Sequence, residues 1–121
     1  MSKFIIRAVP SGIKFDLIAG NGQSIATSEV YETVAACRRG IASVGNNALK
    51  AKLEDLTEQG SPVTNPKFQL YQDRSGRFRF RLRSRNGKTI AISDAYVTKT
   101  GCRDGIDSVK EYAAQAALEE A

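Results

Sequence analysis

The sequence predicts an α+β domain of two tandem β-β-β-α-(β) repeats, which form one pseudo-symmetric body with an antiparallel sheet covered by two helices. The first observation is an internal repeat at a spacing of 65 residues, and the second is a change within each repeat from strand-like to helix-like periodicity. With 121 residues, the chain is long enough for one core and too short for two large domains. We therefore expect repeat 1 over residues 1–57, a linker over 58–66 and repeat 2 over 67–121, all in one compact domain.

The duplication is visible in identical residues that recur 65 positions later. Matches near the start of each repeat have a spacing of 64, so one residue was gained or lost near the first turn. So many matches in one frame exceed chance, and they indicate a duplicated unit. The pairs include Asn21 with Asn86, Ile25 with Ile90, Tyr31 with Tyr96, Cys37 with Cys102, Gly40 with Gly105 and Val44 with Val109.

The first part of each repeat is predicted to be a meander of three strands. Phe78, Phe80 and Leu82 alternate with arginines, which is typical of a strand with one apolar and one solvated face. The Asn-Gly pair that follows in both repeats is a strong hairpin signal. A three-residue loop ending in a glycine bulge would place Leu82 opposite Ile90, whereas a two-residue loop would place it opposite Ala91. The hydrophobic pattern favours the longer loop.

The second part of each repeat is predicted to be a helix that covers the sheet. Thr33 and Thr98 stand where a helix N-cap is expected. Cys102, Ile106 and Val109 follow at helical spacing and share one face, as do the equivalent residues of repeat 1. A glycine lies beside this face in both repeats. Because glycine costs about 1 kcal/mol relative to alanine inside a helix, we expect the helix to approach the sheet closely there.

The order of motifs resembles a known family. Lys-Phe, Ser-Gly, Phe-x-Leu, Asn-Gly, Ile-Ala-x-Ser, Tyr and Gly-Ile-x-Ser-Val resemble the YegP-like family of small bacterial proteins of uncharacterised function, over nearly the whole chain. The resemblance implies that each repeat ends in a short strand and that the repeats exchange these strands, at 51–57 and 116–121. Propensity alone predicts instead a continued helix over 110–120, so both interpretations of the C-terminal stretch remain open.

Composition limits the classes of function. The formal net charge is +5, and the sequence contains no histidine, which removes the commonest general base and zinc ligand. We therefore expect no enzyme activity, no cofactor and no metal site. No apolar run approaches the roughly 20 residues that span a bilayer, and no signal peptide begins the chain. We expect a cytoplasmic protein that is a monomeric chain, an intramolecular pseudo-dimer of repeats, with no membrane partner.

Several reactive residue types have structural explanations. Cys37 and Cys102 lie on the core face of their helices, so we expect buried, reduced thiols that pack rather than react. Tyr31 and Tyr96 precede the helices and are expected to pack on the first turn and the sheet. The aspartates at turns and on the outward helix face lack the spacing of a metal-binding loop and are expected to be solvated. They are Asp73, Asp94, Asp104 and Asp107.

One basic feature stands out from the background. Arginines occupy alternate positions of one strand, so they project from one face at intervals of roughly 6 to 7 Å. We predict that this arginine ridge is exposed on the open face of the sheet, since the phenylalanines of the same strand face the helices. The candidate polyanion-binding residues are Arg77, Arg79, Arg81, Arg83, Arg85 and the nearby Lys88.

The sequence leaves three functional interpretations. The leading one is a non-enzymatic binding or structural module, in which the arginines simply keep the sheet face soluble. The second is a weak, sequence-independent binder of nucleic acid or another polyanion through the arginine ridge. The third is an enzyme of unknown class, which perturbed titrating groups in a deep pocket would support.

Overall fold

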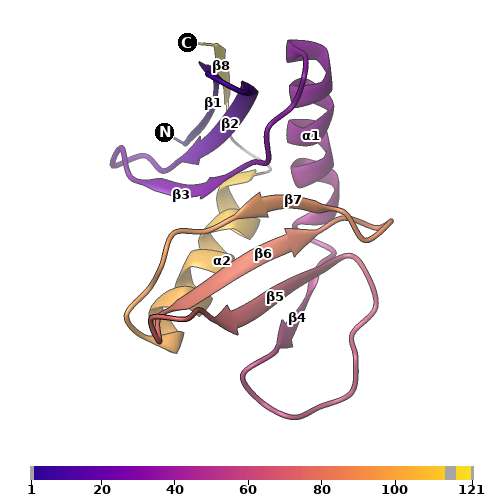
Figure 1. Ribbon diagram of the computed structural model, residues 1–121, viewed down its shortest axis with the longest axis vertical. Helices are drawn as coiled ribbons and strands as arrows, with labels where there is room; N and C mark the ends of the chain where they lie inside the picture. Colours follow the sequence, from indigo (N-terminus) through magenta and orange to yellow (C-terminus); the bar gives the residue numbers. More distant parts are fainter. Residues whose placement is uncertain (1, 114–116, 121) are drawn as a thin grey trace.

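The computed structural model describes residues 2–113 and 117–120. In this part of the chain, one mixed sheet of eight strands is covered by two helices (Figure 1). The elements in chain order are β1 (Lys3–Val9), β2 (Gly12–Ile18), β3 (Ser24–Thr27), α1 (Val34–Asn47), β4 (Lys52–Asp55), β5 (Lys67–Gln72), β6 (Phe78–Arg83), β7 (Thr89–Ile92), α2 (Lys99–Ala113) and β8 (Ala117–Glu120). The first half of the molecule means β1 to β4 with α1, and the second half means β5 to β8 with α2.

The strand order is β4-β5-β6-β7-β3-β2-β1-β8. The two meanders meet at the centre of the sheet, where β3 pairs with β7 through Thr27 and Ile92. β1 and β2 stand steeply in Figure 1 while β3, β6 and β7 cross the view, so the sheet is strongly twisted. The α+β class with one sheet and two helices agrees with the prediction.

The two edge strands correct the prediction of an antiparallel sheet. β4 pairs with β5 in parallel, and β8 pairs with β1 in parallel. Parallel neighbours cannot be joined by a tight hairpin. The stretch 56–66 therefore carries the chain back along the sheet from the end of β4 to the start of β5. β8 reaches β1 from the other end of the sequence, after α2.

These edge strands are also the exchanged ones. β4 belongs to the first half and adds to the second, whereas β8 belongs to the second half and adds to the first. The C-terminal stretch resolves the two open interpretations in favour of a strand, since α2 ends at Ala113 and β8 begins at Ala117. Residues 114–116 and 121 lie outside the described part of the chain.

The β6–β7 hairpin has the predicted loop. The Ser84 amide donates to the Lys88 carbonyl at 2.8 Å, and the Gly87 amide donates to the Ser84 carbonyl at 2.9 Å. Three residues therefore form the loop, and Gly87 ends it with a φ of 86°. This left-handed conformation favours glycine, which explains the second residue of the Asn-Gly pair.

The register beyond this loop differs from the prediction. Arg83 pairs with Thr89 as a three-residue loop requires, but Leu82 then pairs with Ala91, not with Ile90. A bulge at this point makes Ile90 an extra residue in β7. Ile90 and Ala91 are consequently both buried, at 3% and 1% exposure, which strict alternation along a strand would forbid.

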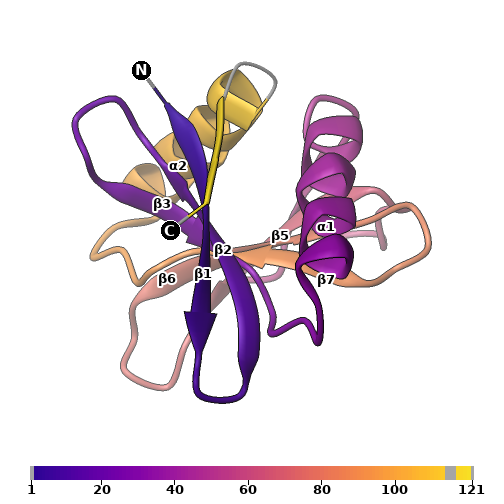
Figure 2. The ribbon, with the colours of Figure 1, turned by 90° about the horizontal axis from the view of Figure 1, so that it is seen from above.

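Each helix joins the two halves. α1 packs against β2 of its own half and β7 of the other, and α2 packs against β6 and β3 (Figure 2). Both N-caps are as predicted, because Thr33 Oγ1 accepts from the Ala36 amide and Thr98 Oγ1 from the Gly101 amide, each at 3.0 Å. Neither helix of residues 2–113 is long and apolar enough to cross a membrane.

The helical glycines mark the close approach that the sequence predicted. A Cβ atom on Gly105 would lie 3.1 Å from the ring of Phe80 in β6 and 2.3 Å from the Tyr96 hydroxyl oxygen. Gly40 has the same relation to Phe15 and Tyr31. The nearest group is thus a tyrosine from the segment before the helix, which reaches beneath the helix backbone and leaves no room for a side chain.

Candidate functional site

The six predicted basic residues lie in two separate places. The alternate arginines of β6 lie together on the face away from the helices, as predicted, but they are half-buried and not exposed. The hairpin turn carries the last two residues toward α1. Arg77 is exposed just before β6. Arg79, Arg81 and Arg83 form the sheet-face group, and Arg85 and Lys88 form the hairpin group.

A single glutamine accepts hydrogen bonds from two arginines of the sheet-face group. Gln69 of β5 is only 8% exposed, and its Oε1 accepts from Arg81 Nε at 2.7 Å and from Arg83 Nε at 2.9 Å. Its Nε2 donates to Glu54 Oε1 at 2.7 Å, because Glu54 of β4 is directly opposite Gln69 in the parallel register. The guanidinium groups are therefore held on the sheet by an uncharged amide.

The carboxylate behind this amide has its own partners. Lys67 Nζ lies 3.0 Å from Glu54 Oε1, and the Val63 amide donates to Glu54 Oε2 at 2.8 Å. The hydrogen bonds from Gln69 and the Val63 amide, with a smaller contribution from Lys67, lower the pKa of Glu54 from 4.5 to about 2. Lys67 balances the charge of Glu54, and within residues 2–113 neither Arg81 nor Arg83 forms an ion pair with a carboxylate.

Arg79 differs from its two neighbours. Its Nε lies 3.0 Å from Asp73 Oδ2, which makes an ion pair across the β5–β6 turn. Asp73 also accepts from the Ser75 hydroxyl at 2.6 Å, and these bonds lower the pKa of Asp73 to about 2. Asp73 is thus a turn-forming residue, not merely a solvated charge, and Arg79 adds no net charge to the face.

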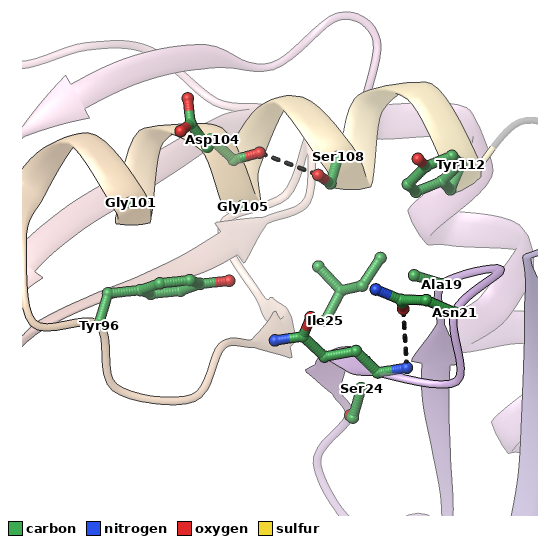
Figure 3. A pocket seen from close by; sticks show the side chains of 11 residues that line it. Ala19, Asn21, Ser24, Ile25, Tyr96, Gly101, Asp104, Gly105, Ser108 and Tyr112 are labelled. Carbon is green, nitrogen blue, oxygen red and sulfur yellow. Dashed lines mark hydrogen bonds between the residues drawn. The ribbon is translucent and has the colours of Figure 1, made fainter.

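The other side of the sheet carries two clefts lined by equivalent positions of the repeat. The α2 cleft, of about 240 Å³, lies between α2 and the β2–β3 hairpin of the other half (Figure 3). Tyr96 lies under the helix, and Gln23 donates from its backbone to Asn21 Oδ1 at 3.0 Å in the facing turn. The Asp104 carboxylate points away from Tyr96 in this view. The lining also includes Ile25, Gly105, Ser108 and Tyr112.

The α1 cleft has the same volume, but its helix comes from the first half and its hairpin from the second. It lies between α1 and the β6–β7 hairpin and also measures about 240 Å³. A shallower hollow of about 470 Å³ shares three of its residues and adds Asn47 and Arg85. The polar and charged residues of the α1 cleft are Tyr31, Arg39, Ser43, Ser84, Asn86 and Lys88.

The sequence analysis missed the helix side of this cleft. Arg39, Ser43 and Asn47 are spaced four residues apart in α1, so they share one helical face. That spacing was a detectable polar stripe. The sequence could not show, however, that this stripe faces Lys88 and Asn86 from the hairpin of the other half.

The cysteines lie where the sequence predicted. Cys37 and Cys102 are fully buried and are not joined in a disulfide. Burial raises the pKa of both thiols, and that of Cys102 to about 11, which disfavours the nucleophilic thiolate. Asp94, Asp104 and Asp107 are exposed, and within residues 2–113 and 117–120 no group of acidic residues and cysteines could hold a metal ion.

Comparison with known proteins gives a family without an assigned role. A family model described as a domain of unknown function, DUF1508, matches residues 12–55 and 73–120. A UPF0339 protein of Bordetella pertussis is 36% identical over 112 residues, which cover 91% of this chain and 86% of that protein. A UPF0339 protein of Treponema denticola is 50% identical over 54 residues, or 45% of this chain and 93% of that protein. The Treponema protein therefore has about the length of one repeat.

A solved structure has the same architecture. The solution NMR structure of a protein of unknown function, YegP from Escherichia coli, superimposes with a TM-score of 0.81. The match covers 98% of this chain and 91% of that chain, at 27% sequence identity. The comparison supports the mixed sheet with two helices and adds no biochemical activity.

Proposed function

This chain belongs to the DUF1508 family, whose members have no known function, and we propose from its own geometry that it is a non-enzymatic module that binds nucleic acid without sequence specificity. The binding surface is the open face of β6. The observation that carries the proposal is the use of one neutral side chain, Gln69, to hold both Arg81 and Arg83. A carboxylate in that place would have neutralised them.

The hydrogen bonds leave the guanidinium groups able to bind. A guanidinium has five N–H donors. Arg81 uses only Nε within the described residues, and Arg83 uses Nε and one Nη1 bond to the Gly87 carbonyl at 2.9 Å. The Arg81 guanidinium also lies 4.6 Å from the centre of the Tyr71 ring. Both side chains are therefore already ordered, which reduces the entropy lost on binding a phosphate.

A non-enzymatic role fits the reactive groups of the chain. Both thiols are buried with raised pKa values, and the sequence has no histidine. Glu54 and Asp73 have lowered pKa values and are held as hydrogen-bond acceptors, which makes them weak general bases at neutral pH. The surface therefore offers charge and hydrogen-bond donors, which suit binding better than catalysis.

The proposal is tested by the double variant Arg81→Gln/Arg83→Gln with mixed-sequence DNA and RNA over a range of salt. The wild type should bind both at low salt, with little preference for sequence. Removing two phosphate contacts should reduce the slope of log K against log salt by about 1.4 to 1.8. The matched control is Lys14→Gln/Lys50→Gln, which removes the same charge from β2 and from the segment after α1, away from β6, and should change the slope by less.

Two results would contradict this function. One is a wild-type protein that binds neither nucleic acid at low salt. The other is a double variant that binds as tightly as the matched control, because net charge alone would then explain the affinity. Thermal unfolding of each variant shows that the loss of binding does not come from loss of the fold.

We also propose that the two repeats form one pseudo-symmetric domain, with the stretch 58–66 as the linker. The exchange of β4 and β8 supports this, since each half supplies an edge strand to the other. A chain of residues 1–60 would contain β4 without its partner β5, and α1 would lose β7. It should therefore show no cooperative unfolding as a monomer. A well-dispersed monomeric spectrum from residues 1–60 would refute the proposal.

A further inference from the structure

The α1 cleft and the α2 cleft differ in charge more than in construction. Both contain a tyrosine, a helical glycine, a helical serine, an asparagine from the turn and an isoleucine, at positions 65 residues apart. Two further pairs of equivalent positions differ in charge. Arg39 and Lys88 in the α1 cleft correspond to Asp104 and Gln23 in the α2 cleft. Among residues 2–113, no acidic residue lines the α1 cleft or the hollow that continues it.

The fold does not need these two cations. The α2 cleft forms between equivalent elements with an acid and an amide in their places. The side chains of Arg39 and Lys88 also make no hydrogen bond or ion pair with any residue of the range 2–113. Two positive groups therefore line one concave surface without a partner in the protein, which is unfavourable unless solvent or a ligand compensates them.

The walls of the α1 cleft are joined, which keeps its shape. Asn47 near the end of α1 accepts from the Arg85 amide at 3.2 Å, so it connects the helix to the hairpin of the other half. The same side chain donates to the Ser43 carbonyl at 2.7 Å and to the Ser43 hydroxyl at 3.1 Å. On the hairpin, the Ser84 hydroxyl bonds Asn86 Oδ1. The polar groups around the cations are thus positioned before any ligand arrives.

We propose that the α1 cleft is a binding site for a small phosphate-bearing ligand, whose phosphate group lies between Arg39 and Lys88. A phosphate monoester carries close to two negative charges at neutral pH, which the two cations match. Arginine, lysine, serine hydroxyl and asparagine amide are all common phosphate partners. Ile90 and the Tyr31 ring offer an apolar surface to the organic part, and the volume of about 240 Å³ suits a small molecule.

This site is distinct from the open face of β6. The α1 cleft is lined by residues of α1 and of the β6–β7 hairpin, on the side of the sheet that the helices cover. Figure 2 shows α1 beside β7 on that side. The two sites share no residue. Arg81→Gln/Arg83→Gln should accordingly leave phosphate binding in the α1 cleft unchanged, so the proposed nucleic-acid function and this inference can fail independently.

The test is a titration of the 15N-labelled full chain with inorganic phosphate and with phenyl phosphate at constant ionic strength. The amide signals of Arg39, Ser43 and residues 84–88 should shift, and phenyl phosphate should bind more tightly. Acetate should shift them far less. Arg39→Gln/Lys88→Gln should weaken phosphate binding at least about tenfold, since the loss of even one charged hydrogen bond has an effect of that size. The matched control Lys14→Gln/Lys50→Gln should bind like the wild type.

A gain-of-function variant covers the case in which the loss variant does not fold. Asp104→Arg/Gln23→Lys places the same two cations in the α2 cleft, and phosphate should then also shift the amides of residues 19–23 and 104–108. Saturable phosphate shifts at the α1 cleft that the loss variant abolishes would support the proposal. It would be overturned by absent or nonspecific shifts in the wild type, by equal binding of acetate, or by unchanged binding in Arg39→Gln/Lys88→Gln.

Discussion

The two halves of the molecule are alike on the helix side of the sheet and different on the open side. Phe4 and Phe15 meet edge to face at 5.7 Å, and Phe68 and Phe80 do so at 5.8 Å. On the open side, by contrast, the second half has the network of Gln69 and its arginines. At the equivalent positions the first half has Ile5 and Ile18 on neighbouring strands, with Arg7 paired to Asp16.

This difference teaches which side of the sheet is constrained by packing. Buried aromatic pairs interlock at a density close to that of crystals, so a change in one requires changes around it. An open face has no such requirement, and one half could acquire uncompensated charge while the other did not. The same holds for the two clefts, where the shared glycine and isoleucine are buried. The positions that differ in charge, by contrast, are exposed, namely Arg39 and Asp104 and also Lys88 and Gln23. Candidate functions therefore lie where the halves differ.

The largest expected effect is the loss of stability when an equivalent core ring is removed from either half. Phe15→Ala and Phe80→Ala should each reduce the free energy of unfolding by about 3 to 5 kcal/mol, because both rings are fully buried in equivalent environments. Denaturant unfolding measures both. If one substitution cost much less than the other, the two halves would not share one packing arrangement.

A smaller effect concerns the helical glycines. Gly40→Ala and Gly105→Ala should each destabilise the protein by about 1 to 3 kcal/mol, because the new methyl group would collide with Tyr31 or Tyr96. Gly45→Ala in α1, the helix of Gly40, is the matched control, since nothing lies within 4 Å of its added Cβ. The control should stabilise the protein by about 0.5 to 1 kcal/mol. Stabilisation by all three changes would remove the packing explanation of the glycines.

The third prediction concerns the network that Glu54, Gln69 and Lys67 form where β4 pairs with β5. Glu54→Gln should cost about 1 to 3 kcal/mol at neutral pH, because Lys67 and the Val63 amide lose a charged acceptor. The folded pKa of Glu54 is lowered from 4.5 to about 2, so its stabilising effect is complete above pH 4.5 and is lost as the pH falls toward 2.

Acid unfolding of the wild type and Glu54→Gln tests this window. The difference in unfolding free energy between the two proteins should stay constant above about pH 5 and shrink toward pH 2. Glu58→Gln, on an exposed side chain, should change stability at neutral pH by no more than about 0.5 kcal/mol. A difference that grows on acidification would show that the Glu54 carboxylate destabilises the fold.

The smallest effect belongs to the open face of the first half. Arg7 Nε lies 2.6 Å from Asp16 Oδ2, but the arginine side chain is 42% exposed, so solvent screens the pair. A double-mutant cycle with Arg7→Ala and Asp16→Ala should give a coupling of about 0.2 to 1 kcal/mol. A coupling larger than the cost of Glu54→Gln would reverse the comparison, because the pair between β1 and β2 would then be stronger than the network between β4 and β5.

The sequence by itself determined the local structure of this protein. Alternation and helical spacing placed the strands and helices, Thr33 and Thr98 were recognisable caps, and the core positions of Cys37 and Cys102 followed from the apolar stripe. These features depend on residues within a few positions of each other, whose geometry is the same in every fold. The Asn-Gly pairs likewise predicted a hairpin, because a left-handed glycine is a local requirement. The hydrophobic pattern favoured the three-residue loop, although the register it implied for Leu82 was wrong.

Only the tertiary structure decided which distant groups meet. The bulge at Ile90 depends on burying two consecutive residues under helices, and the parallel edges depend on where β4 and β8 arrive after those helices. Gln69 was an unremarked residue of β5 until β4 and β6 brought Glu54 and the arginines to either side of it. Arg39 meets the β6–β7 hairpin only because α1 packs across both halves. Such contacts join residues dozens of positions apart. Periodicity along the chain shows which residues share a face of a helix or strand, but not which other element that face contacts.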